Sequence, residues 1–337
     1  MPTLADQTPA AIAADPAWMP HIIDRARRAV QFQRIARTTL GEPGFLADRI
    51  PAKPSDACWV SFDDVAAMQP AIGPLHFIFH TAFCRSTLLV RALNHPGVSA
   101  GLAEPRIIVA LNNAGEDRPR LARPLLDLLS RTGEGEQAVF VKPTNHANAV
   151  VPLLMDTRPD AKAVLMTNPL PSFLNAVTRK GLMGRRWGRQ LFAEMQGYAG
   201  MDFGMPPAEV FAMTDMQAAG LAWFLNQRFL TQLADRYGDR VRVLDGDCFD
   251  TARAQTIRAL AAFTGLAASD AQIEAVTTGP AFTTHAKLGG NFATKDTADT
   301  KRTLSAVGEE EVAQVALWVG MIAEQAGLEV PVRQTLF

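Results

Sequence analysis

The stretch FIFHTAFCRSTLL, Phe77 to Leu89, decides the fold of this chain. It predicts an apolar strand, a loop and a helix that begins near Ser86 and Thr87. A unit of this kind directs backbone N–H groups and a helix N-terminus at an anion. The two hydroxyls are placed to cap the helix or to bind that anion, and Arg85 adds positive charge with no acid inside the loop. We therefore expect a phosphate-binding loop here.

A plainer interpretation of the same stretch stays open. The loop contains no glycine, and it lacks the lysine of the GxxxxGK[ST] pattern. An ordinary strand-to-helix turn, with Ser86 as the N-cap of the helix, fits these residues equally well. The choice between the two depends on the rest of the chain.

From Leu75 onward, short apolar segments alternate with helical patterns. The predicted strands are Leu75 to Phe79, Gln137 to Lys142, Ala161 to Thr167 and Arg240 to Asp245. The predicted helices are Ser86 to His95, Ala218 to Tyr237, Thr251 to Leu266 and Glu309 to Ala326. Such alternation indicates βαβ units, so we expect a P-loop-like α/β fold with a parallel central sheet flanked by helices.

The N-terminal part follows a different pattern. Apolar residues between Ile22 and Phe32 recur at near-helical spacing among arginines, and a proline-rich break follows from Pro43 to Pro54. We therefore expect an N-terminal helical appendage over residues 1–70 and one α/β domain over residues 71–337. An acceptor-binding lid and a dimer arm are both open as roles for the appendage.

Composition excludes several classes of protein. Of 337 residues 48% are hydrophobic and 20% charged, which suits a buried core and excludes a disordered chain. The net charge of −1 gives no general attraction to nucleic acid or to an anionic membrane. The sequence has three scattered cysteines, and it shows no secretory signal and no long apolar stretch. We therefore expect a cytoplasmic protein without disulfides or a membrane span.

The run Phe77 to Arg106 resembles the 5′-phosphosulfate-binding loop and the following segment of sulfotransferases, above all tyrosylprotein sulfotransferases and their bacterial relatives. The matching positions are Ser86 and Thr87 in the loop, His95 and Pro96 at the helix end, then Glu104 and Arg106. Two further stretches, Val139 to Pro169 and Val241 to Leu266, are similar to the family's later strand segments. The resemblance thus covers Leu75 to Leu266.

The resemblance implies an enzyme that moves a sulfuryl group from 3′-phosphoadenosine 5′-phosphosulfate to a hydroxyl or amine of a small molecule or peptide. Positioning and charge stabilisation dominate chemistry of this kind. The resemblance assigns the 5′-phosphosulfate to the loop and helix start, His80, Thr81, Ala82, Phe83, Cys84, Arg85, Ser86 and Thr87. No metal is expected, since the histidines lack metal-ligand spacing.

The resemblance also implies the catalytic residues. Lys142 would stabilise the bridging oxygen, Glu104 would be the general base and Arg106 would steady the reacting groups. His146 is the rival base, because cytosolic sulfotransferases place a catalytic histidine shortly after the matching lysine. The plainer alternatives are a lysine that extends to solvent at a strand end and a surface ion pair of Glu104 with Arg106.

This chain departs from the family in two places. The loop has Phe83 where the family has a basic residue, and Arg85 fills a glycine position. The 3′-phosphate positions read Thr167 and Asn175, or Asn168 and Ala176 in a register shifted by one residue, so the family's arginine is missing. Its charge is expected instead from the downstream residues Arg179, Lys180, Arg185 and Arg186. A late polar loop with His285 and Lys287 is expected to fold over the nucleotide.

Two other functions stay open on the same residues. Asp245 after an apolar strand, with Thr87, would suit the magnesium ligands of a P-loop kinase or another nucleotide-dependent transferase. The missing 3′-phosphate arginine also suits a relative that binds nucleotide without catalysis. Magnesium-independent nucleotide binding separates the sulfotransferase from the kinase.

Overall fold

The computed structural model describes residues 7–283, 306–328 and 335–337. It contains a five-stranded parallel sheet in the order β5-β6-β4-β7-β8. The strands are β4 (Leu75–His80), β5 (Ser99–Ala103), β6 (Ala138–Lys142), β7 (Ala163–Thr167) and β8 (Val241–Asp245). The predicted α/β fold with a parallel sheet flanked by helices is therefore confirmed.

Burial explains why the sequence predicts most of these strands. Every residue of β4, β6 and β7 is buried, and strands covered on both faces appear as continuous apolar runs. The exception is β5, whose sequence SAGLA has small residues and no strong strand propensity. A Cβ on Gly101 would lie 1.9 Å from the Val90 carbonyl oxygen, so β5 has small residues because helix α3 (Ser86–Ala92) lies directly against it.

The predicted N-terminal helical appendage is wrong. Residues 18–61 form a three-stranded antiparallel sheet of β1 (Trp18–Asp24), β2 (Ala29–Arg34) and β3 (Ala57–Ser61). Ile23 and Val30 are partners across the β1–β2 hairpin. They are seven residues apart in the chain, close to two turns of an α-helix, so the hairpin imitates a helical period. The boundary at residue 70 stays a prediction.

The chain divides into two compact units, and the described parts of residues 1–79, 86–163 and 252–292 form the first. It holds the N-terminal sheet, β4 up to Phe79, β5 and β6. Its α-helices are α1 (Pro9–Ala14), α2 (Phe62–Ala67), α3, α4 (Arg106–Asn112), α5 (Arg118–Leu129), α6 (Val151–Thr157), α12 (Arg253–Thr264), α13 (Asp270–Thr278) and α14 (Pro280–Thr283). Short 3₁₀ turns are η2 (Arg37–Thr39), η3 (Leu46–Asp48), η4 (Pro54–Asp56), η5 (Gly115–Asp117) and η6 (Asn145–Val150).

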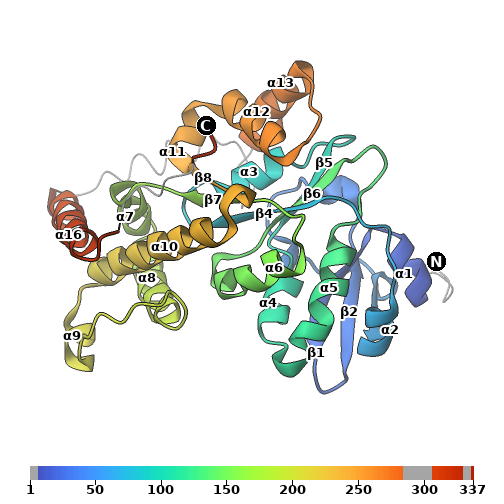
Figure 1. Ribbon diagram of the computed structural model, residues 1–337, viewed down its shortest axis with the longest axis horizontal. Coiled ribbons are helices and arrows are strands. Elements are labelled where there is room, and N and C mark those ends of the chain that lie inside the picture. Colours follow the sequence, from blue (N-terminus) through green and yellow to red (C-terminus); the bar gives the residue numbers. More distant parts are fainter. Residues whose placement is uncertain (1–6, 284–305, 329–334) are drawn as a thin grey trace. The chain divides into compact units, whose positions relative to one another are not determined.

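The second unit comprises the described parts of residues 80–85, 164–251 and 293–337. It contains most of β7, β8, the turn η7 (Gly238–Arg240) and the helices α7 (Leu170–Arg179), α8 (Gly181–Gln196), α9 (Pro207–Ala212), α10 (Asp215–Tyr237), α11 (Gly246–Thr251) and α16 (Ala306–Gln325). Helices α8 and α10 lie side by side (Figure 1), and a Cβ on Gly188 would approach the Ala219 Cβ to 2.8 Å. Val315 and Val319 of α16 pack against Gly220 of α10, as expected for a core-facing stripe.

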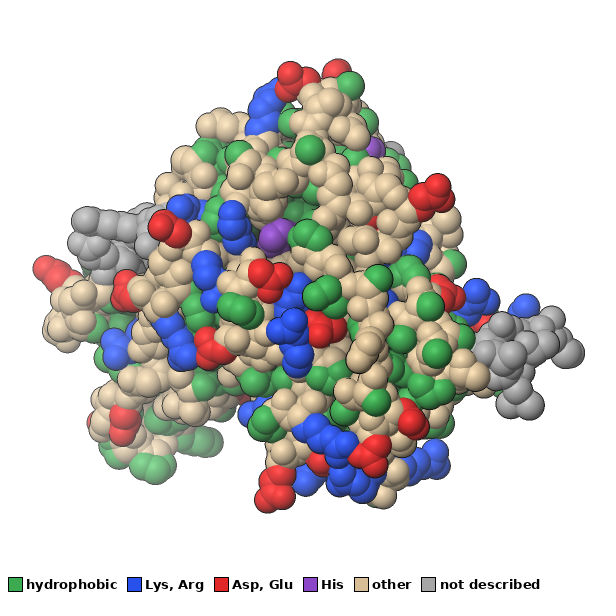
Figure 2. Space-filling model, turned by 45° about the vertical axis from the view of Figure 1, so that its right-hand side comes forward, with side chains coloured by type: hydrophobic (Ala, Val, Ile, Leu, Met, Phe, Trp, Pro, Cys, Tyr) green, Lys and Arg blue, Asp and Glu red, His purple; other side chains and the backbone are tan. Residues whose placement is uncertain are grey.

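The surface mixes both signs of charge. Figure 2 shows Lys and Arg side chains interspersed with Asp and Glu over one face of the molecule. Among the residues that the structure describes, no helix has the length and apolar character needed to cross a membrane.

Candidate active site

The loop after β4 has an unusual backbone. Ala82, Phe83 and Arg85 have φ values of 72°, 55° and 65°, a region that side chains other than glycine rarely occupy. Each such residue costs about 1–3 kcal/mol and persists only where its surroundings enforce it. Left-handed residues in a loop turn successive backbone N–H groups toward one concave side, which binds anions. The lack of glycine therefore does not keep this loop out of the left-handed conformation that glycine usually adopts.

Contacts within the second unit hold the loop in this conformation. The His80 Nδ1 accepts a hydrogen bond from the Ala82 N–H at 3.1 Å. The Thr81 N–H donates to the Met166 carbonyl oxygen at 3.0 Å, and the Cys84 thiol donates to the same oxygen at 3.5 Å. A Cβ on Gly246 would lie 2.4 Å from the Cys84 carbonyl oxygen, so the start of α11 closes directly on the loop.

The charge of Arg85 is balanced from outside the loop. Its guanidinium pairs with the Asp247 carboxylate at 2.5 Å and with the Asp250 carboxylate at 3.2 Å. The Ser172 hydroxyl donates to the second oxygen of Asp247 at 2.7 Å. The sequence showed no acid within the loop, but the fold supplies two from α11. The charge of Arg85 is therefore balanced within the fold, which leaves backbone N–H groups as the candidate donors to an anion in this loop.

Phe83, at the position of the family's basic residue, anchors the loop to apolar partners. Its ring lies 4.9 Å from Trp187 and 5.9 Å from Phe173, measured between ring centroids. These contacts come from α7 and α8 of the same unit. The side chain thus fixes the strained backbone and is not directed at an anion, so any contact of this residue with a cosubstrate involves its backbone.

Five buried side-chain oxygens in the described part of the second unit lack a hydrogen-bond partner. Three are at predicted cosubstrate positions or their one-residue alternative, Thr81 Oγ1, Asn168 Oδ1 and Asn175 Oδ1, and two are on α10, Asn226 Oδ1 and Gln227 Oε1. Leaving such a group unsatisfied costs about 1–3 kcal/mol, and each one calls for an explanation such as a ligand or a water. Amide oxygens accept hydrogen bonds, so those of Asn168 and Asn175 suit the hydroxyl and amino groups of a nucleoside better than a phosphate. Thr167, by contrast, accepts a hydrogen bond from the Gln227 side chain.

The basic residues predicted downstream have different surroundings. Arg185 pairs with Glu311 of α16 at 2.8 Å, and this hydrogen bond raises the pKa of the guanidinium. Arg179 ends α7 and is exposed. Its role near a 3′-phosphate stays a prediction. His285 and Lys287 lie outside the described residues.

In the first unit, two predicted catalytic residues meet. β5 and β6 are parallel partners with Ala103 opposite Lys142, so Glu104 follows directly at the carboxyl ends of the strands. The Glu104 N–H donates to the Lys142 carbonyl oxygen at 2.7 Å, and the Lys142 ammonium forms an ion pair with the Glu104 carboxylate. The Lys142 side chain is 1% exposed and that of Glu104 17%. Lys142 therefore does not extend to solvent, and Glu104 pairs with it rather than with Arg106.

The segment around η3 covers this ion pair. The Lys142 Nζ lies 5.4 Å from the centroid of the Phe45 ring, a cation–π contact. The Ala47 N–H donates to the Glu104 carbonyl oxygen at 3.1 Å and helps to hold the left-handed backbone of Glu104, whose φ is 52°. Sequence reasoning missed Phe45, because no local pattern links it to Lys142.

Arg106 and His146 lie on neighbouring elements of the same unit. Arg106 begins α4 and is exposed, whereas His146 is half-buried in η6, which packs against α4. Arg106 also affects His21 of β1: burial is the larger cause, and the charge of Arg106 the smaller one, that lowers the pKa of the His21 imidazole to about 4. Ser86 and Thr87 are buried at the start of α3. The roles predicted for these residues stay predictions.

Nothing among the described residues favours a metal site. No group of three or more His, Cys, Asp and Glu side chains in that part of the chain is placed to hold a metal ion. The Asp245 carboxylate, which the kinase alternative requires, accepts hydrogen bonds from the N–H groups of Asp247 at 2.7 Å and Cys248 at 3.2 Å. It therefore serves the start of α11.

No protein-family model matches the chain, and no curated protein matches it. One similar solved structure is a sulfotransferase domain from the curacin biosynthetic pathway, with 14% identity and a TM-score of 0.42 over 78% of this chain and 100% of that chain. A second is a sulfotransferase from Alicyclobacillus acidocaldarius, with 18% identity and a TM-score of 0.39 over 77% of this chain and 98% of that chain. A third is a sulfotransferase domain from the Synechococcus PCC 7002 olefin synthase, with 12% identity and a TM-score of 0.40 over 78% of this chain and 98% of that chain. These similar structures are all sulfotransferases, at a level of similarity too low to carry an argument about the activity of this chain.

Proposed function

We propose that the chain is a sulfotransferase that transfers a sulfuryl group from 3′-phosphoadenosine 5′-phosphosulfate to a hydroxyl or amine of a small molecule or peptide. The observation that carries the proposal is the buried ion pair of Glu104 and Lys142. A lysine that is 1% exposed is costly to bury, and such pairs are typical of sites where charge is used. Both residues match catalytic positions of the sulfotransferases, the family that the sequence resembles.

The ion pair suits the chemistry of the transfer. The acceptor oxygen or nitrogen forms a bond to sulfur, while the bond from sulfur to the phosphate oxygen breaks. The acceptor proton passes to the Glu104 carboxylate, and the Lys142 ammonium balances the negative charge that develops on the leaving phosphate. The phosphate competes with Glu104 for the lysine, so binding of the donor frees the carboxylate to act as the base.

The loop residues support binding of the cosubstrate. The left-handed backbone at Ala82, Phe83 and Arg85 suits an anionic phosphosulfate. The unpartnered oxygens of Asn168 and Asn175 suit the nucleoside hydroxyl and amino groups. We propose Arg179 as a source of charge for the 3′-phosphate. The three free cysteines suit a reducing compartment, and we propose a cytoplasmic location.

The test is sulfuryl transfer from a ³⁵S-labelled donor to a panel of phenols, alcohols and amines. Glu104→Gln removes the base and keeps the shape, so we expect a loss of about 10²–10⁴-fold in kcat. Lys142→Met removes the charge at the leaving oxygen, with a loss of about 10²-fold or more. Glu116→Gln, at an exposed position of the same unit, is the matched control and keeps full activity.

Two results would contradict the proposal. Transfer at the wild-type rate by folded Glu104→Gln and Lys142→Met proteins would show that these residues do not carry the reaction. Transfer of phosphate from ATP with magnesium, in place of sulfuryl transfer, would favour the kinase. Circular dichroism of each variant separates a loss of chemistry from a loss of fold.

A further inference from the structure

Residues 43–48, which we call the cover loop, lie over the proposed reacting pair. The Lys142 side chain is 1% exposed, and the Phe45 ring of the cover loop lies 5.4 Å from its Nζ. The Ala47 N–H donates to the Glu104 carbonyl oxygen at 3.1 Å. Transfer brings reacting groups within about 3 Å of the Lys142 ammonium and the Glu104 carboxylate. Groups that shield the lysine must therefore move before a donor phosphate can reach it.

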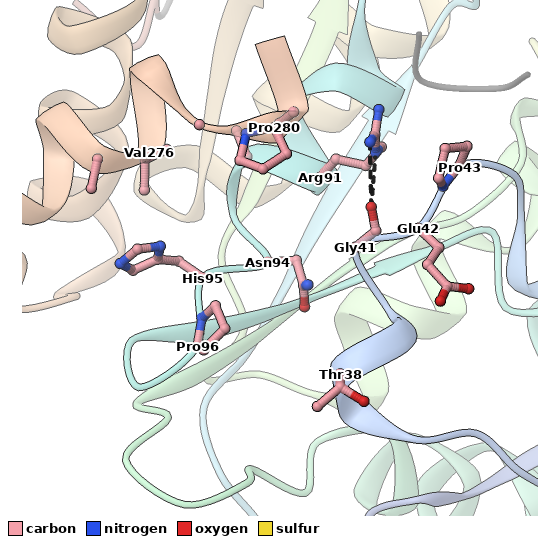
Figure 3. A pocket seen from close by; sticks show the side chains of 14 residues that line it. Thr38, Gly41, Glu42, Pro43, Arg91, Asn94, His95, Pro96, Val276 and Pro280 are labelled. Carbon is pink, nitrogen blue, oxygen red and sulfur yellow. Dashed lines mark hydrogen bonds between the residues drawn. The ribbon is translucent and has the colours of Figure 1, made fainter. Parts of the chain in front are cut away.

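Two arginines hold the base of the cover loop. The Arg49 guanidinium donates to the Thr39 carbonyl oxygen at 2.7 Å and pairs with the Glu42 carboxylate at 3.0 Å. Arg91 of α3 donates through Nε and a terminal nitrogen to the Gly41 carbonyl oxygen, both at 3.3 Å (Figure 3). A short loop whose ends are held together is an Ω-loop, a common functional element of protein surfaces. The base is thus fixed, and motion is left to the residues between its two ends.

The backbone of the cover loop has a place to bend. Gly44, directly before Phe45, has a φ of 100°, a region that glycine adopts at low cost, and a Cβ there would meet no atom within 4 Å. Leu46 is the single buried residue of the cover loop. A segment that buries so little apolar surface opens at low cost. Rotation at Gly44 therefore redirects Phe45 without disturbing the core.

A cavity of about 460 Å³ lies beside the cover loop. Gly41 and Pro43 lie at one side of the cavity and Val276 at the other (Figure 3). Neither Glu104 nor Lys142 lines it, so the cavity and the reacting pair border different parts of the loop. All of these residues belong to one unit. Close-packed neighbours would block a movement of the loop, whereas the cavity offers space into which it opens.

We infer that Arg49 is a positioning residue for the transfer and that the cover loop opens toward the cavity to admit the substrates. Arg49 acts through the loop, because it holds the base in the position from which Phe45 closes over Lys142. Closure excludes water from the reacting groups and strengthens their electrostatic interactions. The role in transfer rests on the proposed function, whereas the shielding of Lys142 by Phe45 does not.

The test measures the acetylation rate of each lysine by mass spectrometry, with acetic anhydride as the probe on the full chain. Phe45→Ala removes the ring and Arg49→Met releases the base, so each should raise the Lys142 rate at least about fivefold. Lys162, half-buried elsewhere in the same unit, is the internal reference and should keep its rate. Arg123→Met, an exposed arginine of α5 with an acidic partner, is the matched control and leaves both rates unchanged.

A cavity variant tests the direction of opening. Thr38 is exposed and lines the cavity, so Thr38→Trp fills the space without changing a buried residue. It should slow acetylation of Lys142 at least about threefold, because the loop has less room to open. An unchanged Lys142 rate in this variant would refute opening into the cavity.

Other outcomes separate the cover loop from the proposed function. A wild-type Lys142 rate in Phe45→Ala and Arg49→Met would refute the inference, and so would an equal rise at Lys162, which would show loosening of the whole unit. Adenosine 3′,5′-bisphosphate should slow acetylation of Lys142 in Phe45→Ala if the chain is a sulfotransferase. No protection there would contradict the proposed function and leave the cover loop intact.

Discussion

Removing one member of the Glu104–Lys142 pair should destabilise the fold by an amount that depends on which charge remains. Glu104→Gln leaves an ammonium that is 1% exposed, whereas Lys142→Met leaves a carboxylate that is 17% exposed. Breaking a buried pair costs about 3–5 kcal/mol when the remaining charge is fully buried, and less when water can reach it. We therefore expect a loss of about 3 kcal/mol for Glu104→Gln and about 1–2 kcal/mol for Lys142→Met.

The double variant separates the ion pair from the packing. The double variant removes both charges of the pair and leaves neither one buried without the other, so it should be less destabilised than the sum of the two single variants. We expect a coupling energy of about 2 kcal/mol, above the roughly 0.5 kcal/mol seen for independent sites. Urea unfolding followed by circular dichroism measures all four proteins. Additivity within about 0.5 kcal/mol would refute the buried pair, as would a larger loss for Lys142→Met than for Glu104→Gln.

Three further predictions follow from the loop and from buried histidines. Gly246→Ala places a Cβ 2.4 Å from the Cys84 carbonyl oxygen, so it should weaken binding of adenosine 3′,5′-bisphosphate and cost about 1–3 kcal/mol of stability. Gly320→Ala, whose Cβ would lie in open space, is the control and should cost nothing. Calorimetry measures binding and thermal unfolding measures stability, and equal effects of the two substitutions would contradict the close contact of α11 with the loop. Ala82→Gly relieves the strain of a φ of 72°, so the unfolding free energy should stay within about 0.5 kcal/mol of the wild-type value. Ala92→Gly in α3 is the control and should lower the unfolding free energy by about 1 kcal/mol or more, as measured by urea unfolding. A larger loss for Ala82→Gly than for Ala92→Gly would show that Ala82 is not strained. Burial lowers the pKa of both His21 and His76 to about 4, so between about pH 4 and 6.5 the unfolded chain binds more protons than the folded chain. The free energy of unfolding should therefore fall as the pH drops through that window, by at most about 3 kcal/mol per histidine. An unfolding free energy that does not change with pH in this window would contradict the burial of the two histidines.

The sheet shows what an amino-acid pattern can predict. β4, β6 and β7 are buried on both faces, and that burial selects apolar runs that are visible in the sequence. The residues of β5 are selected instead for the close approach of α3 at Gly101, which removes any strand signal. The N-terminal hairpin is ambiguous in another way, because Ile23 and Val30 face each other across two strands at a separation that also fits a helix.

The site shows a similar division. The resemblance identified Glu104 and Lys142, and the parallel register of β5 and β6 then brings them into contact. The partners of Arg85 on α11 and the position of Phe45 beside Lys142 depend on segments far apart in the chain. A conformation such as the left-handed backbone of the loop is also invisible when the residues are not glycines.

Calorimetric titration with adenosine 3′,5′-bisphosphate tests the central claim most directly. The titration is run on the wild-type chain with and without magnesium, beside a matched titration with ATP. A sulfotransferase should bind the bisphosphate at micromolar concentrations independently of magnesium, and more tightly than it binds ATP. Magnesium-dependent preference for ATP, or no binding of either nucleotide, would contradict the account.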